Sequence, residues 1–214
     1  MKRFEYKYAL TNVTLESVID TISYHPAGFS EAYPTRLINN FYLDTISYNL
    51  FYQNIDGISN RRKFRYRWYN NFEPNKKGNL EVKHKENELG WKDIFPVVLK
   101  DISTKEKLIK HFEATQLTPH HFEPLLYNQY QRLYFVSNDG KFRVTIDHNQ
   151  KYGLPYPSGQ YFDLRHRDQT IIVELKFDQS EFAHLDEITN HLPYLRTKNS
   201  KYSNGIQHLI NRAV

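Results

Sequence analysis

Charged and apolar residues alternate along five stretches of the chain, and this pattern limits the folds that the chain can adopt. In one stretch, Arg65 and Arg67 alternate with Phe64, Tyr66 and Trp68. Successive side chains of a β-strand point to opposite faces, so each stretch predicts a strand with one charged and one apolar face. The charged positions of the five stretches are Arg3, Glu5 and Lys7; Arg65 and Arg67; Glu81, Lys83 and Lys85; Lys141 and Arg143; and Glu174 and Lys176.

The predicted charged face has two interpretations. Antiparallel sheets often bury one face and expose the other, so a solvated surface is the ordinary explanation. Arginine and lysine predominate here, however, and the planar guanidinium group binds phosphate with paired hydrogen bonds. Because rows of like charge repel one another, we expect the strands to close into a barrel around an anionic ligand. The expected fold is α+β and mainly antiparallel β, a closed eight-stranded tunnel with a basic lumen and flanking helices.

Composition narrows the class of protein. The 214 residues suffice for one core, and we expect a single domain over residues 1–214. The chain has no cysteine, which excludes disulfides, zinc knuckles and thiol nucleophiles. A formal charge of +5 and a pI near 9.1 indicate acidic partners. Since no apolar segment is long enough for a signal peptide or a membrane span, we expect a soluble cytoplasmic protein.

Helices are predicted between and after the strands. Thr11 or Thr14 can cap a helix that runs to about residue 22, and Ser103 with Glu106 forms a capping box for another. Ser180 and Ser203 are the expected caps of two later helices. The strands are expected at 3–8, 36–44, 61–69, 80–85, 127–136, 141–147 and 170–177, with a short helical turn at 47–53 and about eight strands in all.

Two pairs of residues indicate phosphate and metal chemistry. Arg65 and Arg67 lie one pleat repeat apart and can bind adjacent phosphates of a chain. Glu174 and Glu5 place carboxylates among the bases, and Mg²⁺ or Mn²⁺ takes one or two carboxylates together with phosphate oxygens and water. Either carboxylate could instead pair with a neighbouring cation. The aromatic residues of the strands lie opposite the bases, which argues against nucleic acid, because nucleic-acid binders interleave the two on one surface.

The segment before the last predicted helix is also basic. Lys198 and Lys201 lie near its start, where free backbone N–H groups attract anions, although a solvated basic loop is the alternative. The ten histidines show no metal-ligand spacing. The chain has neither a glycine-rich phosphate loop nor a serine or cysteine nucleophile motif.

Taken in order, these segments resemble the triphosphate tunnel metalloenzyme (CYTH-like) superfamily, and within it the polyphosphate polymerase domain of the vacuolar transporter chaperone (VTC) family. The resemblance rests on Arg-Phe-Glu-Tyr-Lys-Tyr at 3–8, Phe-Tyr-Leu-Asp-Thr at 41–45, Arg-Lys-Phe-Arg-Tyr-Arg-Trp-Tyr at 62–69, Leu-Glu-Val-Lys-His-Lys at 80–85, Gln-Arg-Leu-Tyr-Phe with Lys-Phe-Arg-Val-Thr-Ile-Asp within 131–147, Val-Glu-Leu-Lys-Phe at 173–177 and Lys-Asn-Ser-Lys-Tyr-Ser at 198–203. Arg3 stands where much of the superfamily begins with glutamate, which argues against a second metal site.

The resemblance implies an ATP-polyphosphate phosphotransferase. Such an enzyme transfers the terminal phosphoryl group of ATP to a polyphosphate chain, with Mn²⁺ or Mg²⁺ as cofactor. ATP, triphosphate and polyphosphate are then the expected partners. The resemblance implies catalytic roles for Lys7, Arg65, Arg67, Lys83, Arg143 and Lys201, substrate binding by Lys85, Lys176, Lys198 and Ser200, and metal binding by Glu174 and Glu5.

Two other functions stay open. A hydrolase of tripolyphosphate or nucleoside triphosphates would need a base to activate water, for which Glu5 or Glu81 is the candidate. A non-catalytic polyphosphate-binding module would use the same cations without chemistry. The sequence leaves the oligomeric state unassigned.

Overall fold

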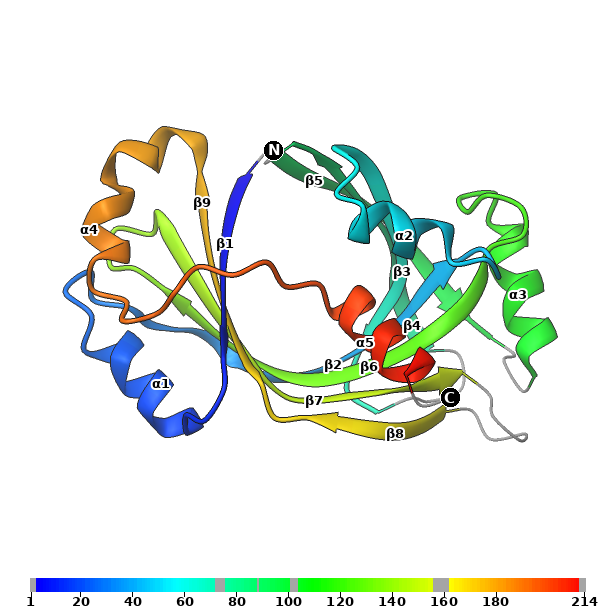
Figure 1. The fold of residues 1–214 in the computed structure, drawn as a ribbon, viewed down its shortest axis with the longest axis horizontal. Helices are drawn as coiled ribbons and strands as arrows, with labels where there is room; N and C mark the ends of the chain where they lie inside the picture. Colours follow the sequence, from blue (N-terminus) through cyan, green and yellow to red (C-terminus); the bar gives the residue numbers. More distant parts are fainter. Residues whose placement is uncertain (1–2, 72–75, 88, 101–103, 156–161, 212–214) are drawn as a thin grey trace. The chain divides into compact units, whose positions relative to one another are not determined.

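The computed structural model describes residues 3–71, 76–87, 89–100, 104–155 and 162–211. The chain divides into two compact units, each built from separate segments (Figure 1). Unit 1 comprises residues 1–36, 130–150 and 169–199, and unit 2 comprises residues 37–129, 151–168 and 200–214. Strands β2 (Ser30–Asp44), β6 (Glu123–Val136) and β7 (Phe142–Pro155) contribute residues to both units.

Unit 1 contains a sheet in which β9 (Ile171–Asp178) lies between β1 (Arg3–Leu10) and β7. Both pairings are antiparallel. The apolar sides of these strands form one buried cluster with helix α1 (Leu15–Ser23) and helix α4 (Leu185–Thr189). The predicted alternation is confirmed here, since Val144, Val173 and Leu175 are all fully buried.

Unit 2 contains β3 (Asn60–Tyr69) between β2 and β4 (Lys76–Glu86), with β5 (Leu89–Leu99) next to β4. Phe64, Tyr66 and Trp68 are buried in its core, as their alternation with the bases predicts. Helices α2 (Asn49–Ile55), α3 (Lys105–Ala114) and α5 (Lys201–Ile210) contribute apolar residues to the same core. Strand β8 (Phe162–Asp168) neighbours β7.

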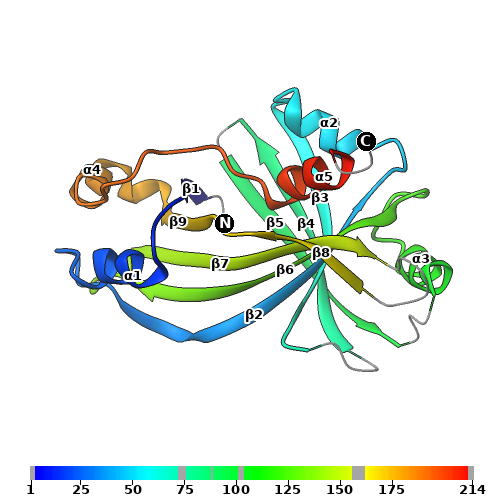
Figure 2. The ribbon, with the colours of Figure 1, turned by 60° about the horizontal axis from the view of Figure 1, so that its bottom comes forward.

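One buried carboxylate fixes two helices of unit 2. Asp44 accepts hydrogen bonds from the backbone N–H groups of Leu50 and Phe51, both at 3.0 Å, and thereby caps α2. The Tyr202 hydroxyl donates to the same carboxylate at 2.5 Å. Helix α5 consequently lies beside α2, as Figures 1 and 2 both show.

Several predicted boundaries require correction. Thr14 caps α1 as expected, with the Ser17 N–H donating to its side chain. Thr104 caps α3, and Ser103 lies outside the described residues. The last helix is capped by Ser200 rather than Ser203, so Lys201 is its first residue. Residues 179–184 form a 3₁₀ helix before α4, without a cap from Ser180.

The predicted closed eight-stranded barrel was wrong. The described residues form nine strands, and their order begins with β6 and ends with β8, with one additional pairing between β6 and β7. Strand β9 pairs with β7 over residues 142–147 of β7 and with β1 over residues 3–10. Asn149, within β7, has a φ of 52°, in the left-handed region. The sheet is mainly antiparallel with flanking helices but is not a closed barrel.

In the part of the chain that the structure describes, no helix combines the length and apolar character needed to cross a bilayer.

Gly205 permits close packing of α5. A Cβ atom at this position would come within 2.6 Å of Leu126 and 2.7 Å of Tyr152. We predict that Gly205→Ala lowers the free energy of unfolding by about 1–3 kcal/mol, although alanine is the better helix former, because the core must shift. Denaturant unfolding of the two proteins measures this difference in the free energy of unfolding. The exposed Gln207→Ala on the same helix should change stability by less than about 0.5 kcal/mol, and equal effects of the two substitutions would contradict the packing argument.

His25 provides a second test within unit 1. Its Nδ1 accepts from the Ala27 N–H at 3.0 Å, and its Nε2 lies 2.9 Å from the Ile188 carbonyl oxygen, so the ring is neutral with the proton on Nε2. Burial lowers the pKa of His25, and neighbouring His191 lowers this pKa further. The stabilisation should be complete above the unfolded pKa of about 6.5 and should be lost as the pH falls through the lower folded pKa. Urea unfolding at about pH 7 and about pH 5 should show a smaller pH effect in His25→Gln; an equal effect would exclude His25 as the cause.

Candidate functional site

The first group of candidate residues lies on β1 and β9 in unit 1, where Lys7 stands opposite Glu174 and Glu5 opposite Lys176. The Lys7 Nζ lies 2.9 Å from Glu5 and 3.4 Å from Glu174. The Lys176 Nζ lies 2.9 Å from the other oxygen of Glu174. Burial alone would lower the pKa of Lys7, but the two glutamates raise this pKa well above its usual value. Lys7 therefore stays charged.

Arg132 completes this group, which we call the carboxylate cluster (Glu5, Lys7, Arg132, Asp147, Glu174 and Lys176). Its guanidinium forms a buried, two-point ion pair with Asp147, with Nη2 at 2.6 Å from one carboxylate oxygen. The same nitrogen lies 3.3 Å from Glu174. Arg132 does not stand out in the sequence, because two tyrosines flank it at strand spacing. Asp147 could have been found, since Arg143, Thr145 and Asp147 continue the polar side of β7.

The cluster offers oxygen ligands for a divalent cation. Oxygens of Glu5 and Glu174 converge on one point, which the Lys7 ammonium occupies. Magnesium and manganese accept one or two carboxylates when substrate phosphates and water supply the other ligands. Within the described ranges, no group of three or more histidine, cysteine, aspartate or glutamate residues could hold a metal ion. The donor set thus fits a cation that arrives with phosphate, rather than one held by protein alone.

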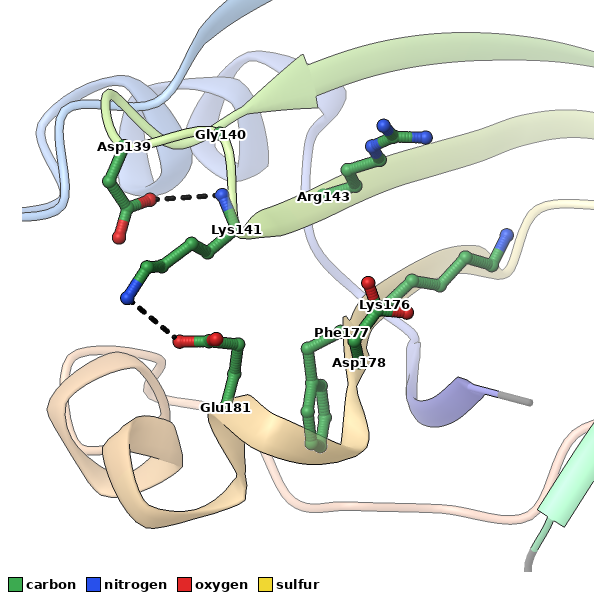
Figure 3. Close-up of a pocket in the computed structure, with 8 residues that line it drawn as sticks. All are labelled: Asp139, Gly140, Lys141, Arg143, Lys176, Phe177, Asp178 and Glu181. Carbon is green, nitrogen blue, oxygen red and sulfur yellow. Dashed lines mark hydrogen bonds and ion pairs between the residues drawn. The ribbon is translucent and has the colours of Figure 1, made fainter. Parts of the chain in front are cut away.

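A pocket of about 220 Å³ lies beside this cluster in unit 1 (Figure 3). Arg143 on β7 is the register partner of Lys176 on β9, and both side chains line the pocket. Figure 3 shows them extending away from the Lys141–Glu181 ion pair, whose atoms are 3.1 Å apart. Arg143 is exposed. It is therefore accessible to an anion from solvent.

The second group lies on β3, β4 and β5 of unit 2, and we call it the arginine cluster (Arg65, Arg67, Glu81 and Lys92). Arg65 is the register partner of Glu81 and donates to one of its oxygens from Nε at 2.8 Å and Nη2 at 2.5 Å. Lys92 lies 3.3 Å from the other oxygen. Burial would raise the pKa of Glu81, but Arg65, Arg67 and Lys92 hold this pKa well below its usual range. Glu81 is consequently a poor base, contrary to one sequence interpretation.

Three lysines stand in register across the same strands. Lys63 on β3 is opposite Lys83 on β4, and Lys83 is opposite Lys92 on β5. Like charges directly opposite each other destabilise a sheet, so this lysine row favours a bound anion. Lys63 was missed although it continues the spacing of Arg65 and Arg67, and Lys92 was missed because β5 was not predicted.

Lys63 also contacts the start of α5. Its Nζ donates to the Ser200 Oγ at 2.7 Å, and this oxygen accepts from the Ser203 N–H at 3.2 Å as the helix cap. Lys201, the next residue, is buried. The structure thus brings Ser200 close to the lysine row.

The remaining predicted residues lie apart from these contacts. Lys85 is half-buried, one register step beyond the lysine row and opposite Arg61, and Lys198 is exposed. The predicted site residues therefore fall into two described groups. Those in or beside the carboxylate cluster are Glu5, Lys7, Arg143, Glu174 and Lys176, and those with the arginine cluster, lysine row and α5 are Arg65, Arg67, Lys83, Ser200 and Lys201. Their roles stay predictions.

The family model of the VTC domain matches residues 2–210. The chain belongs to the VTC domain family. No curated protein matches the chain at a significant level.

Solved structures share the fold at low sequence identity. A protein from Vibrio parahaemolyticus, named provisionally as an adenylate cyclase, aligns over 94% of this chain and 95% of its own with a TM-score of 0.53 and 13% identity. A Bacillus halodurans protein with the same provisional name gives 0.51 and 13% over 93% and 96% of the two chains. Protein PH1819 of Pyrococcus horikoshii gives 0.50 and 11% over 97% and 98%. These likenesses establish the fold alone.

The arginine cluster gives a testable prediction. Glu81→Gln removes a buried charge beside Arg65 and Lys92, so we expect a loss of about 1–3 kcal/mol in unfolding free energy near neutral pH. Because the folded pKa is depressed, the contribution of Glu81 is present above its unfolded pKa of about 4.3 and disappears as the pH falls. Acid unfolding should therefore be less steep in the variant. The exposed Glu113→Gln serves as control, and equal acid profiles for all three proteins would refute the assignment.

Proposed function

We propose that this protein is a metal-dependent polyphosphate polymerase. The single observation that carries the proposal is the lysine row, in which Lys63, Lys83 and Lys92 are cross-strand register partners on three neighbouring strands. A chain of phosphates would neutralise them with regularly spaced negative charge. Membership of the VTC domain family supports a substrate of the triphosphate type.

In this proposal a terminal oxygen of the polyphosphate chain attacks the γ-phosphorus of ATP. The new P–O bond forms as the bond to the ADP oxygen breaks, and ADP leaves with the electron pair. The protein contributes position and positive charge to this step, because phosphoryl transfer requires little covalent chemistry from side chains. We assign contacts with the reacting phosphates to Lys7, Arg65, Arg67, Lys83, Arg143 and Lys201, and binding of the chain to Lys85, Lys176, Lys198 and Ser200.

Glu174 and Glu5 would hold Mn²⁺ or Mg²⁺. When bound, the cation supplies Lewis-acid stabilisation of charge on the phosphoryl oxygens. Lys176 and Arg132 would keep the second oxygen of Glu174 in place, since both lie within 3.3 Å of it.

Hydrolysis of tripolyphosphate or nucleoside triphosphates is the second candidate. It would require a base for water, and Glu81 is unsuited because its pKa is depressed. Glu5 remains as a candidate base, but it is paired with Lys7 at 2.9 Å. Synthesis needs no such base, because the attacking phosphate oxygen is already ionised. The pairing of both carboxylates with cations thus favours transfer over hydrolysis. A non-catalytic binding module is the third candidate.

The decisive measurement is incubation with ATP and Mn²⁺ while polyphosphate and free phosphate are followed together. Polyphosphate with an equal amount of ADP is the expected result. Free phosphate without polyphosphate would assign the hydrolase, and binding of tripolyphosphate without turnover would assign the binding module. Double-stranded DNA bound as tightly as tripolyphosphate would overturn the choice of substrate class.

Glu174→Gln tests the metal assignment. The substitution keeps the size of the side chain but removes the charge that a hard cation requires, so turnover per folded protein should fall by orders of magnitude. Asp147→Asn is the matched control, because Asp147 is fully buried against Arg132 and should affect folding rather than metal dependence. Turnover is measured against Mn²⁺ concentration. An unchanged Mn²⁺ dependence in Glu174→Gln would leave Glu5 as the next candidate ligand.

A further inference from the structure

A buried chain of amides leads from Arg67 to the backbone of β7 in unit 2. The Arg67 Nε donates to the Asn40 Oδ1 at 2.9 Å. The Asn40 Nδ2 donates to the Asn128 Oδ1 at 3.3 Å, and the Asn128 Nδ2 donates to the Lys151 carbonyl at 3.1 Å. Both asparagines are fully buried, and Arg67 is 5% exposed. Buried polar side chains in such a chain are costly unless all are satisfied.

The two ends of the chain determine how each amide is oriented. A backbone carbonyl can only accept, so Asn128 must direct its NH₂ group towards Lys151 and its oxygen towards Asn40. Asn40 must then direct its NH₂ group towards Asn128. Its oxygen therefore faces Arg67, whose guanidinium can only donate. One end of the chain, the Lys151 carbonyl, can only accept, and the other end, the Arg67 guanidinium, can only donate. These two groups therefore determine which way the Asn40 amide is oriented.

The chemistry of the acceptor distinguishes Arg67 from Arg65. The Nε of Arg65 donates to the carboxylate of Glu81, which cancels charge, whereas the Nε of Arg67 donates to a neutral amide. Asn40 is also the register partner of Arg67, so both side chains are on the same face of the sheet. An amide at this position orients the guanidinium without adding a negative charge beside it.

We infer that Asn40 is a positioning residue that orients Arg67 towards a phosphate of the substrate, and that Asn128 fixes the orientation of Asn40. This inference rests on the proposed function. It names two residues outside the charged pattern of the sequence. Neither would touch the reacting atoms.

Asn40→Asp and Asn128→Leu test the inference. The first keeps an acceptor for Arg67 but adds a negative charge beside it, and the second removes the group that orients Asn40. Affinity for tripolyphosphate, measured by titration calorimetry per folded protein, should fall about tenfold to a hundredfold in Asn40→Asp, with a weaker dependence on salt. It should fall several-fold in Asn128→Leu.

Asn39→Asp is the matched control. Asn39 adjoins Asn40 but, with strand alternation, faces the other side of the sheet, where it accepts from the Tyr127 hydroxyl at 2.6 Å and from Gln129 at 2.9 Å. A charge there should lower the melting temperature and leave the affinity for tripolyphosphate unchanged. If Asn40 has only a structural role, Asn40→Asp should also lower the melting temperature and leave the affinity for tripolyphosphate unchanged.

The outcomes separate this inference from the proposed function. If the wild-type protein binds tripolyphosphate and Asn40→Asp binds it equally tightly with the same salt dependence, the inference is wrong and the proposed function stands. If the wild-type protein binds no tripolyphosphate, the proposed function fails and the inference fails with it. If Asn40→Asp does not fold, Asn128→Leu decides, and an unchanged affinity in that variant overturns the inference.

Discussion

Buried carboxylates are the interaction on which the charged faces of both units depend. Cations on neighbouring strands repel one another at the spacing of a sheet, and water cannot screen them once the face is partly covered. Glu81 compensates Arg65 and Lys92 in unit 2, and Glu174 compensates Lys7, Lys176 and Arg132 in unit 1. Each carboxylate serves more cations than its single charge can neutralise. The arginine cluster has three cations for one carboxylate and so has an excess of positive charge, whereas the carboxylate cluster has three of each.

Strand alternation predicted the faces of the sheet correctly, because period-two spacing is a local property of the chain. Alternation failed to predict strands in segments whose residues do not alternate between charged and apolar. Strand β5 contains Lys92-Asp93-Ile94-Phe95-Pro96, which neither alternates nor avoids proline, so its pairing with β4 could not be predicted from local pattern. Ser200 and Ser203 are equally good caps by residue type, and the contact of Ser200 with Lys63 is not visible in the sequence. Barrel closure could not be read from repulsion between charges alone.

The candidate site was predictable only in part for a related reason. Charges placed at strand spacing identified Lys7, Arg65, Glu81 and Glu174, because each belongs to an alternating run. Arg132 and Asp147 are 15 residues apart and form an ion pair between the neighbouring strands β6 and β7. Asn40 and Asn128 are 88 residues apart and uncharged, so no composition or motif argument selects them. Side chains that orient a functional group need no pattern of their own, and their detection requires the fold.

The division of the chain into interleaved segments has a consequence for how the protein can form and vary. The chain passes between the two units after residues 36, 129, 150, 168 and 199. Neither unit is a contiguous fragment, so neither can be produced by truncation or exchanged by a single recombination event. In unit 1 the pairing of β1 with β9 joins residues far apart in sequence, whereas β2, β3, β4 and β5 of unit 2 pair in sequence order. Folding that depends on distant contacts is slow, so we expect this to apply to unit 1. Synthesis of nearly the whole chain must precede completion of either core, because β9 and α5 are added last.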